Sequence, residues 1–399
     1  MNPERFLPAA RIFAVVLVLG ALIALAAWYF YIARAGDTIE ETNAGRGLGG
    51  GIPSFEGSGG STFGNLLGEL PTEAKADETP RVRLSQVHAA PVSGFRLSST
   101  TVQYMDRSGY LFSASLSKET VVRTTNTLIP RVAHTILGDE AFLGFAYDEG
   151  GDARAFVGVL EAATSSRTLP SIAIKDLGDT VVGSSPAGET LLTLVSEPDG
   201  GGSLIESDYD GSSPRLLARS AIDGWTIESA GERVELVERS ASGVPGSAFE
   251  VRAGQFVPLI NDTPGLSVQL GTDAYLYSTD AGTPALYAVS STTRPLPLKT
   301  VADKCAWLPL AIENPLAFCA VPDAIESRTF LDDWYRGETR TRDSWWRIDA
   351  TDGSTKEVFS SPDEGILLDA YNPQVDPSGS YIVFQNKYDE TLWVLRINE

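Results

Sequence analysis

The last stretch of the chain, from Pro373 to Ile397, constrains the fold more than any other segment. A polar turn at Pro377 to Gly379 precedes a short run rich in β-branched and aromatic residues, Tyr381 to Phe384, and a second polar turn precedes another such run, Thr391 to Ile397. Such short runs bounded by turns are typical of β-strands, and strands joined by short turns repeat in propeller blades. The segment therefore predicts the inner half of one blade of a β-propeller.

Similar turn-plus-strand units recur along the chain at steps of about 40 to 50 residues, the length of a four-stranded blade. The earlier units begin near Ser98, Gly138, Ser185, Ser229, Gly271 and Glu313. An insertion of roughly Asp323 to Asp343 widens the sixth unit. Because no helical period runs through this part, the sequence predicts an all-β body, a seven-bladed propeller, with six or eight blades as alternatives.

A propeller has to close its ring, because an open ring leaves two sheet edges free to pair with other chains. The final unit supplies only its strands up to Ile397, so its fourth strand must come from elsewhere. The segment Arg81 to Val87 alternates and immediately precedes the first unit. We predict that it pairs with Thr391 to Ile397 and latches the ring.

A single long apolar segment, Ile12 to Ala33, lies near the amino end and carries no charge. A helix of about 22 residues spans roughly 33 Å, which is enough to cross a bilayer once. Arg5 and Arg11 precede it and acidic residues follow it, so the positive-inside rule places residues 1–11 in the cytoplasm. A cleaved signal peptide is the alternative, since the segment ends in an A-x-A pattern. In both cases the body is exported from the cytoplasm.

The remaining domain boundaries follow from composition and charge. Residues 34–80 are rich in Gly and then in acidic residues, which is typical of a flexible linker, and residues 81–399 form the propeller domain. The formal net charge of -21 opposes binding to phosphate backbones, so no nucleic-acid partner is expected. The expected partners are the cytoplasmic membrane, through residues 12–33, and another envelope protein or a glycan.

Several motifs carry a resemblance to known propellers. The units S-P-A-G-E-T-L-L-T-L-V and D-P-S-G-S-Y-I-V-F resemble the PD40 (WD40-like) repeats of TolB-like propellers. From about Arg81 to Ile397 the chain also looks like a group of single-pass, membrane-anchored bacterial propeller proteins. That second likeness rests on K-C-A-W at Lys304, F-C-A-V-P at Phe318, D-D-W-Y-R-G at Asp332, D-S-W-W-R-I-D at Asp343 and N-K-Y-D-E-T-L-W at Asn386. The resemblance implies a propeller placed in the cell envelope, and it brings no established activity.

The likeness to TolB is limited to the blades. This chain shows no counterpart of the separate amino-terminal domain of TolB, and the apolar segment stands where that domain would be. A role in the Tol system therefore does not follow from the resemblance.

The two cysteines, Cys305 and Cys319, flank a turn centred near Ile312. Residues that are symmetric about the turn of a hairpin face each other, and a directly opposed pair can reach disulfide distance. Outside the cytoplasmic membrane such a pair is oxidised. We predict a disulfide, with two buried free thiols on neighbouring strands as the alternative.

The insertion holds the densest cluster of aromatic and charged residues in the body. The candidate binding surface consists of Asp332, Asp333, Trp334, Tyr335, Arg336 and Trp345. Long loops on a propeller face often carry recognition, and aromatic and Arg side chains suit a binding hot spot or a sugar-stacking platform. The alternative is a structural flap whose rings cover the blade and whose Arg336 pairs with Asp333.

Few residues are available for catalysis or metal binding. With only two histidines and two cysteines, a Cys/His zinc site is not expected, and neither is a cofactor. No G-x-S-x-G motif occurs. The predicted function is a non-enzymatic binding or scaffold module of the bacterial cell envelope. A propeller enzyme acting on cell-wall glycans is the alternative, and it requires acids and an Arg that converge on the central channel. A purely structural spacer is a third reading.

Overall fold

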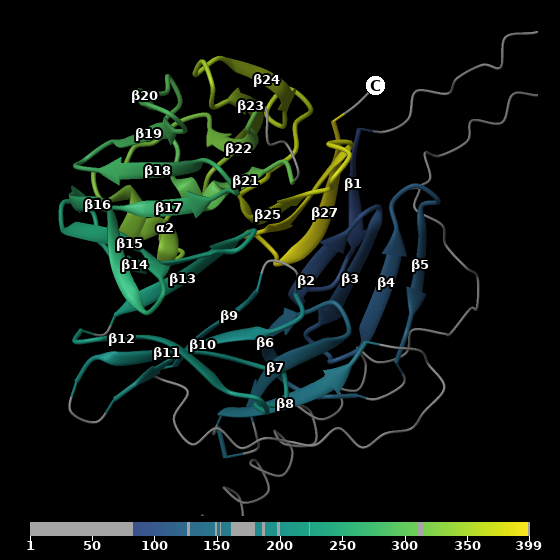
Figure 1. The fold of residues 1–399 in the computed structure, drawn as a ribbon. Helices are drawn as coiled ribbons and strands as arrows, with labels where there is room; N and C mark the ends of the chain where they lie inside the picture. Colours follow the sequence, from purple (N-terminus) through teal and green to yellow (C-terminus); the bar gives the residue numbers. More distant parts are fainter. Residues whose placement is uncertain are drawn as a thin grey trace, which may run out of the picture. The chain divides into compact units, whose positions relative to one another are not determined.

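Seven antiparallel sheets form a ring in the computed structural model (Figure 1). The structure describes residues 83–125, 128–147, 150–151, 153–160, 180–185, 188–197, 200–222, 224–309 and 314–397. Each sheet is a blade, and the inner strands of neighbouring blades contact each other all the way around the ring. The prediction of an all-β, seven-bladed propeller is confirmed.

The first four blades follow one another along the chain. Blade 1 contains β2 (Val92–Ser98), β3 (Thr101–Asp106), β4 (Leu111–Ser115) and β5 (Thr120–Arg123). The described strands of blade 2 are β6 (Val132–Leu137), β7 (Ala141–Tyr147) and β8 (Ala153–Val159). Blade 3 contains β9 (Thr180–Ser184), β10 (Leu191–Ser196), β11 (Gly202–Ser207) and β12 (Arg215–Ser220). Blade 4 contains β13 (Trp225–Ala230), β14 (Arg233–Glu238), β15 (Pro245–Arg252) and β16 (Gln255–Pro264).

The last three blades include the described helices. Blade 5 contains β17 (Ser267–Leu270), β18 (Tyr275–Asp280), β19 (Pro284–Val289) and β20 (Thr293–Pro295). Blade 6 contains β21 (Cys305–Trp307), β22 (Leu316–Pro322), β23 (Asp343–Asp349) and β24 (Thr355–Ser360). The 3-10 helix η2 (Ala302–Lys304) precedes blade 6, and α2 (Phe330–Tyr335) lies between its second and third strands. Blade 7 contains β25 (Ala370–Val375), β26 (Tyr381–Asn386), β27 (Thr391–Arg396) and β1 (Leu84–His88).

The ring is closed by a strand from the amino-terminal side of the domain. β1 pairs with β27 in antiparallel register, with Leu84 opposite Leu395 (Figure 1). Leu84 and Val87 are buried, and they pack in the clusters on either side of blade 7. The predicted latch is confirmed. One detail differs from the prediction, which placed the last two strands in the inner half of the blade. In the structure β26 and β27 form the middle of blade 7, and β25 is its inner strand.

The repeated units found in the sequence all fall at one place in the blades. Each unit covers the turn after an inner strand and the second strand that follows, namely β3, β7, β10, β14, β18, β22 and β26. In the last unit the Asp376 carboxylate accepts hydrogen bonds from the backbone N–H groups of Ser380 and Tyr381, at 2.7 and 2.6 Å. Gly379 has a φ of 67°, which favours glycine. This turn chemistry explains why D-P-S-G-S precedes a strand.

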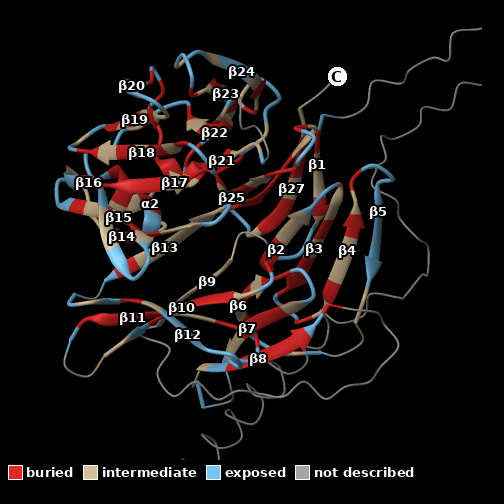
Figure 2. Cartoon of the chain, viewed as in Figure 1, coloured by how far each residue is buried: buried red, intermediate tan, exposed pale blue. Residues whose placement is uncertain are grey.

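The apolar core lies between the blades, where the faces of adjacent sheets meet (Figure 2). Between blades 6 and 7, for example, Trp345 packs with Ile382 and Phe384. Alternation along the strands produces these faces, since in β18 every second residue is buried.

Two predicted segments cannot be placed on this fold. The apolar segment 12–33 and the linker 34–80 lie outside the described residues. Within the ranges that the structure describes, no helix is long and apolar enough to cross a membrane.

Candidate functional site

A cavity of about 560 Å³ occupies the central channel at one end of the ring. Residues from the inner strands of all seven blades line it, close to the points where these strands turn into the second strands. We call this end of the channel the turn end. Every blade contributes lining residues to this concave site, and concave sites with a few polar groups are the default location for ligands.

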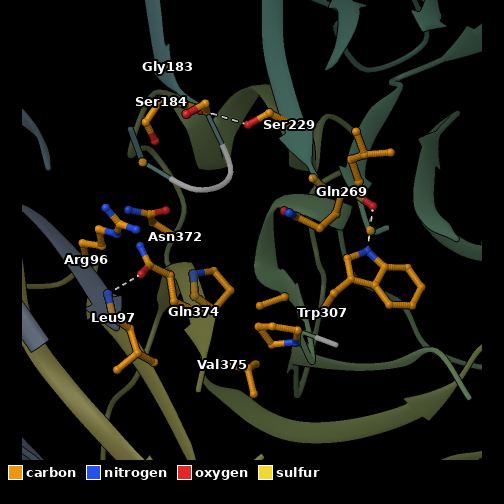
Figure 3. A pocket seen from close by; sticks show the side chains of 18 of the residues that line it. Arg96, Leu97, Gly183, Ser184, Ser229, Gln269, Trp307, Asn372, Gln374 and Val375 are labelled. Carbon is orange, nitrogen blue, oxygen red and sulfur yellow. Dashed lines mark hydrogen bonds between the residues drawn. The ribbon is translucent and has the colours of Figure 1, made fainter. Parts of the chain in front are cut away.

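The wall of the cavity combines glycines and apolar residues with polar side chains, most of which are neutral (Figure 3). Arg96, Asn372 and Gln374 lie together on one wall, and Gln269 and Trp307 lie opposite. The indole N–H of Trp307 donates to the backbone oxygen of Gln269 at 2.9 Å, which fixes the ring at the wall.

Some of these groups serve the ring itself. Gln374 accepts a hydrogen bond from the backbone N–H of Leu97 at 2.7 Å and donates to the backbone oxygen of Phe95 at 3.3 Å (Figure 3). The hydroxyl of Ser229 donates to the backbone oxygen of Ser184 at 2.9 Å. Gln374 thus joins blade 7 to blade 1, and Ser229 joins blade 4 to blade 3, so both are positioned by structural bonds.

The insertion of blade 6 lies at the opposite end of the ring, which we call the α2 end. The carboxylate of Asp280 in blade 5 accepts from the backbone N–H of Leu331 at 3.0 Å. The indole N–H of Trp334 donates to Asp369, just before β25, at 2.8 Å. The Tyr335 hydroxyl donates to Asp303, just before blade 6. Helix α2 is therefore fixed to three consecutive blades.

The structure corrects the candidate binding surface predicted for this insertion. Trp334 is 2% exposed and Trp345 is fully buried in the core between blades 6 and 7, so neither ring can meet a partner. Arg336 pairs with Asp333 at 2.8 Å, as the structural alternative required. Tyr335 remains half exposed. Aromatic and charged composition predicted exposure, but the rings are the apolar underside of a fixed flap.

A buried charged network lies beneath α2 and explains the placement of several motif residues. The ammonium group of Lys304, fully buried, donates to Asp343 and Asp369 at 2.7 Å each and to Thr341 at 2.9 Å. It also lies over the ring of Trp334, 4.8 Å from the centroid. The motifs that carry Lys304, Trp334 and Asp343 are distant in the sequence, and they meet here to hold the insertion on blades 6 and 7.

The two cysteines are joined by a disulfide. Cys305 in β21 lies directly opposite Cys319 in β22, and both are fully buried between blades 5 and 6. The bridge ties an inner strand to its neighbour and faces away from the channel cavity, so its contribution is structural.

Acidic side chains meet at the α2 end of the channel. Glu228 of β13 is directly opposite Glu235 of β14, and Asp303 lies close enough to interact with Glu228. Glu228 is partly buried, and this burial, with the nearby charges of Asp303 and Glu235, raises its pKa well above the usual range. Burial also raises the pKa of Asp303. No group of three or more His, Cys, Asp or Glu in the described ranges is placed to hold a metal ion.

These acids make stability depend on pH. A carboxyl group with a raised pKa binds its proton more tightly in the folded chain, so the free energy of unfolding falls as the pH rises above 4.5, the ordinary value for Glu. We expect Glu228→Gln to raise the free energy of unfolding at pH 8 by up to about 1 kcal/mol and to flatten this fall. Urea titrations between pH 4.5 and 8 measure both effects. The exposed Glu232→Gln is the matched control, and equal curves for the two variants would contradict the expectation.

No sequence motif marks the cavity residues. Arg96 lies inside an ordinary strand pattern, and only the Asn-Pro pair at Asn372 marks an irregularity within the strand β25. Channel residues of a propeller come from seven separate strands, so no local motif can gather them.

Fold and channel together define the class of the protein, a closed seven-bladed β-propeller with an insertion at one end of the ring. No family model matches the chain, and no curated protein matches it. Among solved structures, oligogalacturonate lyase from Vibrio parahaemolyticus is similar, with a TM-score of 0.50 and 9% identity over 82% of this chain and 96% of that chain. The propeller domain of the Trilobed protease from Pyrococcus furiosus gives a TM-score of 0.47 and 9% identity over 78% and 98%. At these identities the likeness extends to the fold alone.

Proposed function

We propose that the chain is a non-enzymatic binding module of the bacterial cell envelope, anchored in the cytoplasmic membrane by residues 12–33 with the propeller outside. We further propose that its ligand is a short glycan segment bound in the turn-end cavity. The observation that supports this proposal is the cavity of about 560 Å³, to which every blade contributes lining residues.

The chemistry of the cavity fits a sugar better than an apolar ligand or an extended protein surface. The wall offers carboxamides at Asn372 and Gln269, the guanidinium of Arg96 and the ring of Trp307 (Figure 3). Planar polar side chains that donate and accept hydrogen bonds suit the hydroxyl groups of a sugar, and a volume of this size suits a small ligand. A segment of a partner protein is the competing ligand, and the experiment below separates the two.

The proposal predicts saturable glycan binding that depends on the open cavity. Isothermal titration of the exported domain with soluble cell-wall glycan fragments of two to four sugars should show binding. Ala230→Trp, which places a large ring at the cavity wall, should weaken it by roughly 10-fold or more. Leu216→Trp on the exposed outer strand β12 is the matched control and should bind normally. Absence of binding by the native domain, or equal binding by both variants, would refute the proposal.

An enzyme acting on cell-wall glycans is the second candidate, favoured by Glu228, Asp303 and Tyr335 at the α2 end. Two acids whose pKa values are raised by burial resemble the acid pairs of glycoside hydrolases. No Arg joins them among the described contacts of Asp303 and Glu228, and α2 lies at that end. Release of reducing sugars by the native domain, lost in Glu228→Gln, would support this candidate over the first.

A further inference from the structure

We propose that Arg96 and Asn372 form a carboxylate-binding subsite in the turn-end cavity, so that the glycan ligand is an acidic one that carries a sugar carboxylate. This inference rests on the proposed function and names the ligand class for the same site. Its elements are a guanidinium on the cavity wall and an asparagine with a positive φ beside it.

Arg96 extends from blade 1 along the cavity wall toward the turns of blades 2 and 3. Its guanidinium lies 3.8 Å from the carboxylate of Asp139, which is 58% exposed, so this ion pair is loose and screened by solvent. The guanidinium also packs against the backbone of Gly188, where an added Cβ would come within 1.9 Å of it. Glycine at this position therefore leaves room for the Arg96 guanidinium at the cavity wall.

Asn372 is held in an unfavourable conformation on the same wall. Its φ is 50°, in the left-handed region, and the register of β25 with β26 shifts around it. A regular strand would turn this side chain toward a blade face, whereas the bulge directs it to the channel beside Arg96 (Figure 3). Strain that is retained inside a polar cavity points to a function for the carboxamide.

Two other titratable groups line the cavity, and of these the exposed carboxylate of Asp273 opposes an anion. Burial lowers the pKa of His134, with a further contribution from Arg107, so the imidazole is neutral at pH 7. Asp273, in the turn between β17 and β18, belongs to blade 5 and is exposed. The chain as a whole carries a net charge of -21, which repels anions. A ligand carboxylate is therefore attracted mainly where a cationic side chain such as Arg96 lies in the cavity.

Titration with three matched ligands tests this subsite: a trimer of a hexuronic acid, its methyl ester, and the neutral hexose trimer. The native domain should bind the acid at least about 10-fold more tightly than the other two, and added salt should reduce the difference. Arg96→Gln should weaken binding of the acid by about 10- to 100-fold and leave the ester and the neutral trimer unchanged. Asn372→Gly, which relieves the strained φ, should weaken the acid by a smaller factor.

The controls separate failure of the subsite from failure of the proposed function. Arg347→Gln, on the exposed side of β23, should bind all three ligands like the native domain. Equal affinity for acid, ester and neutral trimer, with Arg96→Gln unchanged, would overturn the subsite while leaving glycan binding in place. Tighter binding of a tripeptide with a free carboxyl end than of the uronic acid trimer would overturn the glycan assignment itself. Melting curves of each variant show that the fold is intact.

Discussion

Replacing Lys304 with methionine is expected to lower the free energy of unfolding by about 3 to 5 kcal/mol, among the largest effects of any single substitution in this chain. The ammonium group is fully buried and bonds to Asp343 and Asp369 at 2.7 Å each. Without it, two buried carboxylates face each other with no cation, and Trp334 loses one of the charges over its ring. Chemical denaturation at pH 7 measures the change.

The pH dependence of this variant distinguishes the loss of a charge from a packing defect. In the native chain burial raises the pKa of Asp369, but its contacts with Lys304, Trp334 and Thr341 outweigh burial and lower it. In Lys304→Met both acids should have raised pKa values, so the variant should regain stability as the pH falls. Adding Asp343→Asn should restore part of the loss at pH 7, and the exposed Lys356→Met should be neutral. A loss that does not change with pH would contradict the network as its cause.

Disrupting the latch is the second large effect that we expect. Leu84→Asp together with Val87→Asp places two charges in the clusters on either side of blade 7, where both side chains are buried. A loss of about 5 kcal/mol or more is expected, with the melting temperature lower by roughly 10 °C or more. Limited proteolysis should then cut first near the junction of blades 7 and 1.

The matched control adds the same two charges to the same strand at half-buried positions. Ser85→Asp with Gln86→Asp should lower the melting temperature by only a few degrees. Equal melting temperatures for the two double variants would contradict the expectation that the buried side chains of β1 hold the ring closed.

Most of the fold could be predicted from the repeated turn-plus-strand units, which indicated the blades and their number. Each turn between an inner and a second strand has local chemistry, such as the Asp376 side chain that bonds to Ser380 and Tyr381, and local chemistry is legible in a sequence. The latch could be predicted by counting strands, since the last repeated unit contained only three of the four strands of a blade. The register of Cys305 opposite Cys319 likewise follows from the symmetry of a short hairpin.

The site was far less predictable. Trp334 and Trp345 belong to an aromatic, charged segment that looks like a surface, and only packing against blades 6 and 7 shows that they are buried. Arg96 and Asn372 are brought together by ring closure between the first and last blades, a contact between distant parts of the chain. Composition describes such residues one at a time, whereas a channel site is a property of all the inner strands together.

The pairing of β1 with β27 also sets the order in which the protein can fold. β27 is the last strand described in the chain, so β1 emerges first and finds its partner only after every blade has been made. Contacts between such distant segments form slowly, because the loop-closure entropy must be lost before the contact forms. Until then β1 and β26 or β27 present open edges that can pair with other chains. A chain shortened before β27 would have no partner for β1 and an incomplete blade 7, so its ring would stay open.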